Sequence, residues 1–468
     1  MVSENNADQF LQIEGFQGEV LQHGGRGYAA ARQIFNMRMD DVNPSVILKA
    51  SSENDVSLVM KRAAELGHPI GLRSGGHNVD GTPMAADVVL DLSALRQTNV
   101  DLDKKRLSIG PGILLGDLDA LCQEHSMVVP TGTVGTTGVT GLTLGGGIGF
   151  KTRELGATVD HVLRARVVTT SGEIVTASAD ENADLFWGLR GAGANFGVVT
   201  ELEFQATPFT PLANVARLIF PLDQAVSVTS RVNAFMKDAP RELALYPFIT
   251  RAPRGQPGPP TREPFLMILM VTTGDAGDFE KYVETVSSFG PTMMKETVQL
   301  PWNVANTMLE EGAPRSLRSH NRGGYVQDPG EDFFAKWVEH GPSMPDPDGL
   351  ASFAIAGTYC NGAMTEDFEE DSMAFSRENA NFLFEAVGIW TRREEDRANV
   401  GWIDGVVDAA RPQMLTSAYI NLTSDNNLEW LKGVYGKPEK FQRLVDLKTK
   451  WDPQNLLRYN RNIPPATA

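Results

Sequence analysis

Two glycine-rich segments constrain this chain more than any other feature of its sequence. The first, RSGGHN at 73–78, directly follows the strand-like run PIGL at 69–72. Consecutive residues without Cβ let the backbone turn tightly and aim several N–H groups at one point, which makes a nest for phosphate oxygens. The second, PTGTVGTTGVTGLTLGGGIG at 130–149, contains many β-branched residues, which disfavour a helix. Such a segment can lie flat along an extended ligand and contact it through the main chain.

Neither segment matches the two commonest phosphate-binding motifs. The stretch GGGIG at 145–149 does not open a βαβ unit with an acidic residue ~20 positions further on, as a dinucleotide-binding fingerprint requires. No Gly-Lys-Ser/Thr sequence follows it, so a Walker loop is excluded as well. Each segment alone is compatible with an ordinary tight turn. A cofactor is therefore indicated only by the two together.

The composition is that of a globular protein with little affinity for polyanions. The 468 residues carry a formal net charge of −17, which gives no electrostatic basis for binding a nucleic acid. The two cysteines, Cys122 and Cys360, are too few for a disulfide framework or a multi-cysteine metal site, so no metal is expected. The N-terminal residues lack a signal-peptide pattern, and no stretch approaches the ~18 apolar residues of a membrane span. We expect a cytoplasmic protein without a membrane partner, and its oligomeric state stays open.

The pattern of the chain changes at about residue 208. Before it, short β-branched runs alternate with helical patterns, which indicates an α/β arrangement. After it, strand-like runs are longer and fewer, at 213–220, 243–250, 264–274 and 349–360, with helix-like runs at 279–289 and 376–387. This pattern predicts a second sheet with helices on one face, the usual form of a cap over an active site.

Four segments, in this order and spacing, resemble the vanillyl-alcohol-oxidase superfamily of FAD enzymes, and more narrowly its berberine-bridge-enzyme-like branch. They are the two glycine-rich segments, LFWGLRGAGANFGVVTELEF at 185–204 and DPQNLLRYNRNIPP at 452–465. The resemblance implies an α+β fold with a two-part PCMH-type FAD-binding domain, formed by residues 1–208 and 417–468. It also implies an inserted α+β substrate cap at 209–416, in which helices flank an antiparallel sheet. The implied activity is that of an FAD-dependent oxidoreductase, with a small-molecule substrate and dioxygen as partners.

The resemblance also assigns the cofactor site residue by residue. His77 matches the histidine that bonds covalently to the 8α-methyl group of the flavin ring. Many relatives form a second bond from a cysteine, whose place is taken here by Val134, so a monocovalent FAD is implied. The segment that includes Val199 matches the element near the adenine, and 459–462 matches the strand that contacts the flavin ring. The full set of implied FAD-binding residues is Arg73, Ser74, Gly75, Gly76, His77, Asn78, Gly132, Thr137, Gly138, Gly141, Gly146, Gly147, Val199, Tyr459, Asn460 and Asn462.

Four residues are candidates on the substrate side. Tyr419 belongs to a Tyr-x-Asn motif in which relatives have a tyrosine that faces the flavin as a base or an orienting group, although a buried tyrosine needs a hydrogen-bond partner in any case. Thr137 matches a position beside the flavin that is thought to gate oxygen. Tyr246 and Glu366 lie in the predicted cap and could point from it toward the ring. Glu366 also belongs to an acidic run, which favours a solvated surface.

Several functions remain open at this stage. The first is an oxidase that takes a hydride from a C–H bond next to oxygen or nitrogen and reduces dioxygen to hydrogen peroxide, with Tyr419 and Tyr246 handling the proton. The second is a flavin N-oxide monooxygenase, because Thr137 and Leu142 resemble residues that line the oxygen pocket of such an enzyme. A dehydrogenase with another electron acceptor and a non-catalytic flavin carrier are the remaining alternatives. The sequence does not reveal the substrate.

Overall fold

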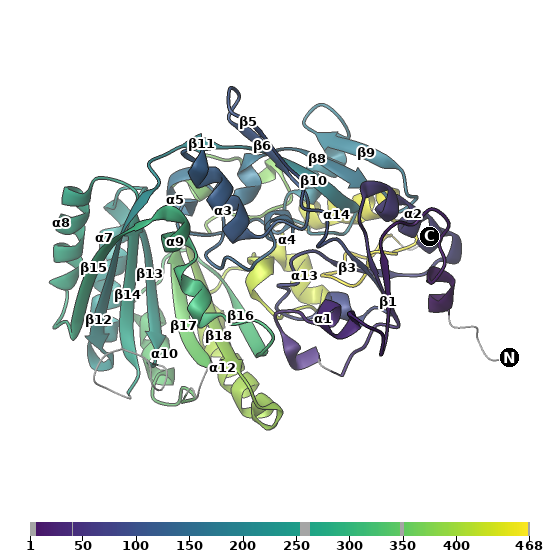
Figure 1. Ribbon diagram of the computed structural model, residues 1–468. Helices are drawn as coiled ribbons and strands as arrows, with labels where there is room; N and C mark the ends of the chain where they lie inside the picture. Colours follow the sequence, from purple (N-terminus) through teal and green to yellow (C-terminus); the bar gives the residue numbers. More distant parts are fainter. Residues whose placement is uncertain (1–5, 40, 253–262, 347–350, 467–468) are drawn as a thin grey trace.

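The computed structural model describes residues 6–39, 41–252, 263–346 and 351–466 (Figure 1). It confirms the expected α+β class. Three smaller sheets and their helices form one part, and a large antiparallel sheet with helices packed on it forms the other. Among the described helices, none combines the length and the apolar composition that crossing a lipid bilayer requires.

A four-stranded sheet carries the first glycine-rich segment. Its strands, in spatial order, are β1 (Glu19–Gln22), β2 (Val46–Lys49), β4 (Val88–Asp91) and β3 (Ile70–Arg73). The last three run parallel, and α2 (Glu53–Leu66) provides the crossover that parallel strands need. The side chain of Ser52 caps the start of α2 by accepting the Asp55 N–H, and Gly67 ends it at φ 59°. Since β3 ends at Arg73, the strand delivers the segment 74–78 to the carboxyl edge of this sheet.

A five-stranded antiparallel sheet lies beside it. Its strands, in spatial order, are β5 (Thr98–Asp101), β6 (Arg106–Ile109), β10 (Val198–Gln205), β8 (Val162–Val168) and β9 (Ile174–Ser178). A small pair, β7 (Met127–Val128) and β11 (Thr207–Pro208), and the helices α1 (Tyr28–Arg32), α3 (Leu115–Glu124), α5 (Thr152–Leu155) and α6 (Ala183–Leu189) complete this part. The central strand β10 begins at Val198, inside the resembling segment 185–204, and its first residues are buried.

The second glycine-rich segment is only partly extended. The expectation that its β-branched residues prevent a helix is wrong for Val139–Leu144, which form the short helix α4. The Thr143 hydroxyl donates to the Val139 carbonyl inside this helix, and Val139 and Leu144 are buried in the core beneath it. Tertiary packing has therefore overridden the low helix propensity of the sequence.

The cap is a seven-stranded antiparallel sheet. Its strands, in spatial order, are β15 (Met294–Pro301), β12 (Leu212–Pro221), β14 (Phe265–Thr272), β13 (Ala244–Thr250), β17 (Ser352–Tyr359), β18 (Phe382–Trp390) and β16 (Arg318–Val326). Four long helices pack on one face of it and share its core: α7 (Ala225–Asp238), α8 (Ala276–Ser287), α10 (Glu331–His340) and α12 (Asp396–Ala410). Two short helices follow strands of this sheet along the chain, α9 (Trp302–Asn306) after β15 and α11 (Ala363–Glu366) after β17.

One element of the cap differs from the sequence expectation. The run 376–387 has helix-like spacing, but its second half belongs to strand β18. Phe384 and Ala386 join the core beneath the helices, whereas Glu385 and Val387 face the opposite side, as the two-residue period of a strand requires. This opposite side closes the site described below.

The last described residues return to the first part of the molecule. Helices α13 (Leu428–Val434) and α14 (Pro438–Trp451) contribute Leu431 and Leu444 to the same core as strands β8 and β10. In Figure 1 these yellow helices lie among the blue elements of the first part. The chain therefore completes its first part only after building the cap, as the resemblance implied.

Candidate active site

One cavity of about 410 Å³ lies where the two glycine-rich segments, the returning segment and the cap sheet meet. Its volume is in the range of ~300–1,000 Å³ typical of small-molecule sites. Thirteen of the expected FAD-binding residues line it: Arg73, Ser74, Gly75, Gly76, His77, Asn78, Gly132, Thr137, Gly138, Gly141, Val199, Tyr459 and Asn460. Tyr419 lines it as well, so residues far apart in the chain share one site.

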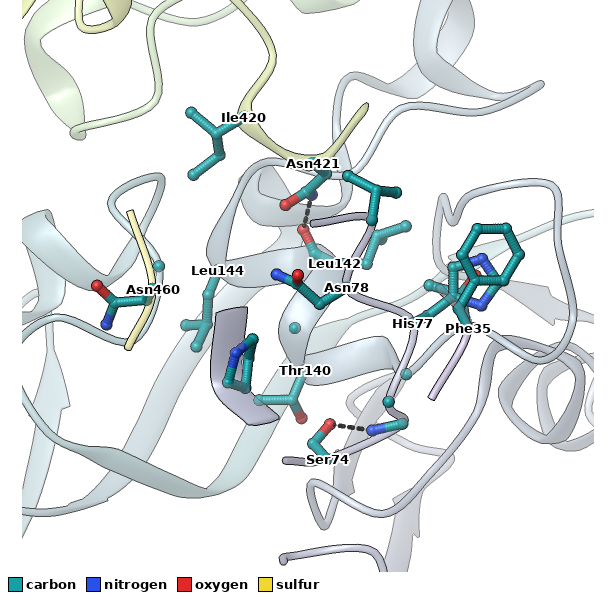
Figure 2. Close-up of a pocket in the computed structure, with 18 of the residues that line it drawn as sticks. Phe35, Ser74, His77, Asn78, Thr140, Leu142, Leu144, Ile420, Asn421 and Asn460 are labelled. Carbon is teal, nitrogen blue, oxygen red and sulfur yellow. Dashed lines mark hydrogen bonds between the residues drawn. The ribbon is translucent and has the colours of Figure 1, made fainter. Parts of the chain in front are cut away.

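The two glycine-rich segments meet main chain against main chain. A Cβ atom on Gly75 would lie 2.4 Å from the nitrogen of Gly138, and one on Gly138 would lie 2.7 Å from the nitrogen of Gly75. Neither position can accept a side chain, because real Cβ contacts are never so short. The Ser74 hydroxyl accepts the N–H of Gly75 at 2.6 Å and fixes the turn (Figure 2). The result is a narrow cleft lined by backbone groups, which suits a pyrophosphate.

His77 lies at one end of this cleft with an unpaired ring nitrogen. The ring of Phe35 stacks on the imidazole, with centroids 4.0 Å apart and planes inclined by 23° (Figure 2). The Nδ1 atom is buried and has no hydrogen-bond partner among the described residues. Burial, with the nearby Arg315 guanidinium as a second cause, lowers the pKa of His77 to about 3. The imidazole is therefore neutral, with a lone pair available for a bond.

The cationic side chains of the lining are already paired. Arg73 forms an ion pair with the buried Asp91 at 2.7 Å, and Arg461 forms one with Asp80 at 3.4 Å. Asn460 donates to the carbonyls of Ala194 and Leu457, which leaves its Oδ1 atom buried and without a partner. The glycine cleft and the orphaned polar atoms fit an FAD molecule.

Tyr419 is held by two donors. Its hydroxyl oxygen accepts the N–H of Ile148 at 3.2 Å and the Nδ2 atom of Asn421 at 3.0 Å. Asn421 is fixed in turn by donating to the Leu142 carbonyl at 2.8 Å (Figure 2). Burial raises the pKa of Tyr419 to about 12, against the opposing effect of these donors. With both lone pairs engaged, the hydroxyl hydrogen is free to donate into the cavity.

Glu385 is a residue of the site that the sequence analysis missed. It projects from β18 into the cavity, and no hydrogen bond or ion pair engages its carboxyl group in the described chain. Burial raises its pKa to about 7. It thus contributes an unpaired acidic group, poised near neutral pH, in a predominantly aliphatic wall beside Val387 and Ile389.

Five expected residues lie outside the cavity lining: Gly146, Gly147, Asn462, Tyr246 and Glu366. Tyr246 is buried in β13, where it packs edge-on against Phe150 at 4.9 Å. Glu366 is largely exposed at the end of α11 and forms an ion pair with Arg241. Burial, and to a smaller extent the nearby charges of Glu385 and Tyr419, raise the pKa of Tyr246, so this tyrosine lies close to two groups of the cavity, whereas Glu366 is engaged at the surface.

The position of Val134 bears on the number of covalent bonds. Val134 lines the cavity, together with Thr137 and Leu142. The two cysteines are buried elsewhere, Cys122 in α3 and Cys360 after β17. Neither cysteine lines the cavity, so neither could reach a ligand there.

Two sequence families match parts of this chain, one near its beginning and one near its last described residues. Residues 44–178 match the family of FAD binding domains, and residues 418–464 match the family described as berberine and berberine like. The (R)-6-hydroxynicotine oxidase of Paenarthrobacter nicotinovorans is 28% identical over 471 residues, which cover 96% of this chain and 97% of that protein. An FAD-linked oxidoreductase of Dictyostelium discoideum is 27% identical, over 97% of this chain and 96% of its own.

Solved structures share the whole fold. The 6-hydroxy-D-nicotine oxidase from Arthrobacter nicotinovorans superimposes with a TM-score of 0.84 at 25% identity, covering 96% of this chain and 98% of that one. A chitooligosaccharide oxidase gives a TM-score of 0.85 at 20% identity, covering 99% and 100% of the two chains. At that identity the second likeness concerns the fold alone.

Proposed function

Because this chain is an FAD-linked oxidoreductase of the berberine-bridge-enzyme-like branch of the vanillyl-alcohol-oxidase superfamily, we propose that it is an oxidase with FAD bonded to His77. Its substrate is a small organic molecule with a C–H bond next to oxygen or nitrogen. Bound FAD supplies the acceptor for a hydride from that bond and passes the electrons to dioxygen, which gives hydrogen peroxide. The observation that carries the proposal is a single cavity lined by both the His77 cleft and the unpaired Glu385.

His77 provides the attachment point. Its imidazole is neutral, is held by the stacked Phe35 and has an orphaned ring nitrogen. Val134 in place of a cysteine, and the distant burial of Cys122 and Cys360, support one bond rather than two. A covalent tether fixes the cofactor and withdraws electron density from the ring, which favours hydride acceptance.

Glu385 accepts the proton that accompanies the hydride. Oxidation of an alcohol or amine carbon removes one hydride from carbon and one proton from the neighbouring oxygen or nitrogen. A general base works best when its pKa lies near the working pH, and that of Glu385 is about 7. Because no other group engages its carboxylate in the described chain, Glu385 is available to the substrate.

Tyr419 orients the substrate rather than deprotonating it. A pKa of about 12 keeps the hydroxyl protonated at neutral pH. Its two lone pairs are occupied by Ile148 and Asn421, so it acts as a donor to the oxygen or nitrogen that is being oxidised. The orienting role was one of the two that the sequence suggested for Tyr419.

The cavity wall supports a compact, largely apolar substrate. Leu142, Val387 and Ile389 line it beside Glu385, whereas a carbohydrate site needs many polar partners. The relative named for 6-hydroxynicotine is consistent with a substrate of that size.

Acid precipitation of the purified protein tests the covalent bond. Yellow colour should remain with the pellet of the wild type and move to the supernatant in His77→Ala. Turnover should then release one hydrogen peroxide for each substrate oxidised, and Glu385→Gln should abolish most of it. Colour that leaves the wild-type pellet would remove the bond to His77 from the proposal.

A monooxygenase is the second candidate, because Thr137 and Leu142 both line the cavity. Turnover under oxygen-18 distinguishes the two functions. Label in the organic product, without stoichiometric peroxide, would favour the monooxygenase, whereas peroxide that carries all of the label favours the oxidase. A protein that oxidises substrate only with an artificial acceptor would instead be a dehydrogenase.

A further inference from the structure

Arg315 connects the two glycine-rich segments. It lies in the loop before β16 of the cap, and its guanidinium group crosses from one segment to the other. Its Nη1 atom donates to the Thr136 carbonyl at 3.1 Å, and its Nη2 atom donates to the carbonyls of Gly75 at 2.8 Å and Gly76 at 3.4 Å. One planar group thus fixes the residues directly before His77 against the second segment.

The backbone around Arg315 is held in an unusual conformation. Ser316 has φ 60°, in the left-handed region that residues other than glycine seldom adopt. Its N–H donates to the Phe35 carbonyl at 3.1 Å, and the N–H of Phe35 donates to the Gly76 carbonyl at 2.7 Å. Arg315, Phe35 and Gly76 therefore form a closed set of contacts around the His77 imidazole. Such strain persists only where the surrounding contacts over-determine it.

The charge of Arg315 is also unusual. The neighbouring Arg73 is neutralised by Asp91, but Arg315 forms no ion pair with any carboxylate in the described ranges. Its positive charge adds to burial in disfavouring protonation of His77. Only an unprotonated imidazole nitrogen has the lone pair that a new bond to carbon requires.

We propose that Arg315 is the positioning residue for covalent attachment of the flavin, holding the neutral imidazole of His77 at the carbon it bonds to. The inference rests on the proposed bond to His77. In that step the 8α-methyl carbon loses one C–H hydrogen and the imidazole loses its N–H hydrogen as a carbon–nitrogen bond forms. The two electrons released, with two protons, reduce one dioxygen to hydrogen peroxide. Arg315 supplies no atom to the product and acts through the placement and the charge state of His77.

The test compares rates of attachment with the strength of FAD binding. Apoprotein from riboflavin-limited cells is mixed with FAD in air, quenched in acid, and assayed for flavin that stays with the polypeptide. Arg315→Lys keeps the charge but cannot bridge three carbonyls on two segments. Its attachment should be at least ~10-fold slower, because misplacing reacting atoms by about 1 Å can cost ~100-fold. In a His77→Ala background, the same change should alter the Kd for FAD by less than ~3-fold, since backbone groups still form the cleft.

A matched control comes from Arg153, whose buried guanidinium also bridges backbone carbonyls, those of Ala239 and Pro240, but outside the cavity lining. Arg153→Lys should lower the Tm without slowing attachment. Wild-type attachment rates in Arg315→Lys would overturn the inference. The inference would also be overturned if Arg315→Lys, in the His77→Ala background, raised the Kd for FAD by as large a factor as it slows attachment. A wild type without any covalent flavin would instead refute the bond to His77.

Discussion

The ring of Phe35 lies nearly parallel to the imidazole of His77, with centroids 4.0 Å apart. The stack restricts rotation of the imidazole and fixes the direction in which its nitrogens point. Phe35 comes from the N-terminal segment, so a third piece of the chain, besides the two glycine-rich segments, sets the geometry of the proposed attachment point.

Phe35→Leu should slow covalent attachment of the flavin several-fold. Leucine fills most of the same space but cannot stack, so the imidazole of His77 rotates more freely. The substitution should also lower the free energy of unfolding by about 1–2 kcal/mol. Phe10 offers a matched control, since it also contacts a histidine, His68, at 5.3 Å but lies outside the cavity lining. Phe10→Leu should lower stability by a similar amount and leave attachment unchanged. Equal attachment rates in Phe35→Leu and the wild type would show that the stack has no such role.

Glu385→Gln should remove the acidic limb of the pH–rate profile. If Glu385 accepts the proton, turnover of the wild type rises with pH as its carboxyl group ionises, with a midpoint near its pKa of about 7. Glutamine keeps the shape but accepts no proton, so kcat should fall by ~10²–10⁴-fold and lose this dependence. Steady-state kinetics between pH 5 and pH 9 provide the check. An unchanged profile in Glu385→Gln would assign the base to another group.

The same substitution should stabilise the protein at high pH. The pKa of Glu385 is raised above its ordinary value of 4.5, so ionisation of this group opposes folding. Its contribution to stability is fully present below pH ~4.5 and is lost as the pH rises through about 7. Glu385→Gln does not titrate, so at pH 8 it should be more stable than the wild type by up to about 3 kcal/mol, at ~1.4 kcal/mol per pKa unit.

Thermal unfolding at pH 4.5 and pH 8 measures this difference. Glu284→Gln is the control, because Glu284 is an exposed partner of Lys295 and its loss should change stability by less than ~1 kcal/mol at either pH. A Tm difference between Glu385→Gln and the wild type that is the same at both pH values would contradict the prediction.

Tyr419→Phe should lower kcat by ~10–100-fold with little change in KM. The lost hydrogen bond to the reacting atom stabilises the transition state more than it stabilises the bound substrate. It should also cost about 1–3 kcal/mol of stability, since the buried Ile148 N–H loses its acceptor. Tyr435 is the matched control, a buried tyrosine outside the cavity lining whose hydroxyl has no partner in the described chain. Tyr435→Phe should be neutral in both measurements. Full turnover in Tyr419→Phe would rule out the orienting role.

Much of the FAD-binding part could be predicted because its signals are local. RSGGHN and the 130–149 segment are contiguous, and glycine is required where two backbones touch, as at Gly75 and Gly138. The α+β class and the returning final segment followed from the same resemblance and are confirmed. The exception, helix α4, forms because buried packing outweighs weak propensity.

The cap side could not be predicted in the same way. Strand β18 has a helix-packed face and a largely aliphatic cavity face, so FLFEAV shows no alternation of apolar and polar residues. Interpreting 376–387 as a helix therefore leaves Glu385 unidentified as a residue of the site. Arg315 lies in an irregular loop without any motif, and only the fold brings it to Gly75. Glu366, by contrast, belongs to an acidic run, and an ion pair with Arg241 engages it at the surface.

The cavity is lined by residues as early in the chain as Ile34 and as late as Arg461. During synthesis on the ribosome, a chain that has already made His77 and both glycine-rich segments still lacks Glu385, Tyr419 and Asn460. The complete flavin pocket therefore does not exist until the returning segment has been synthesised and has folded onto the first part. Yellow colour in this protein reports that translation has proceeded at least through the returning segment, and products that stop within the cap stay colourless.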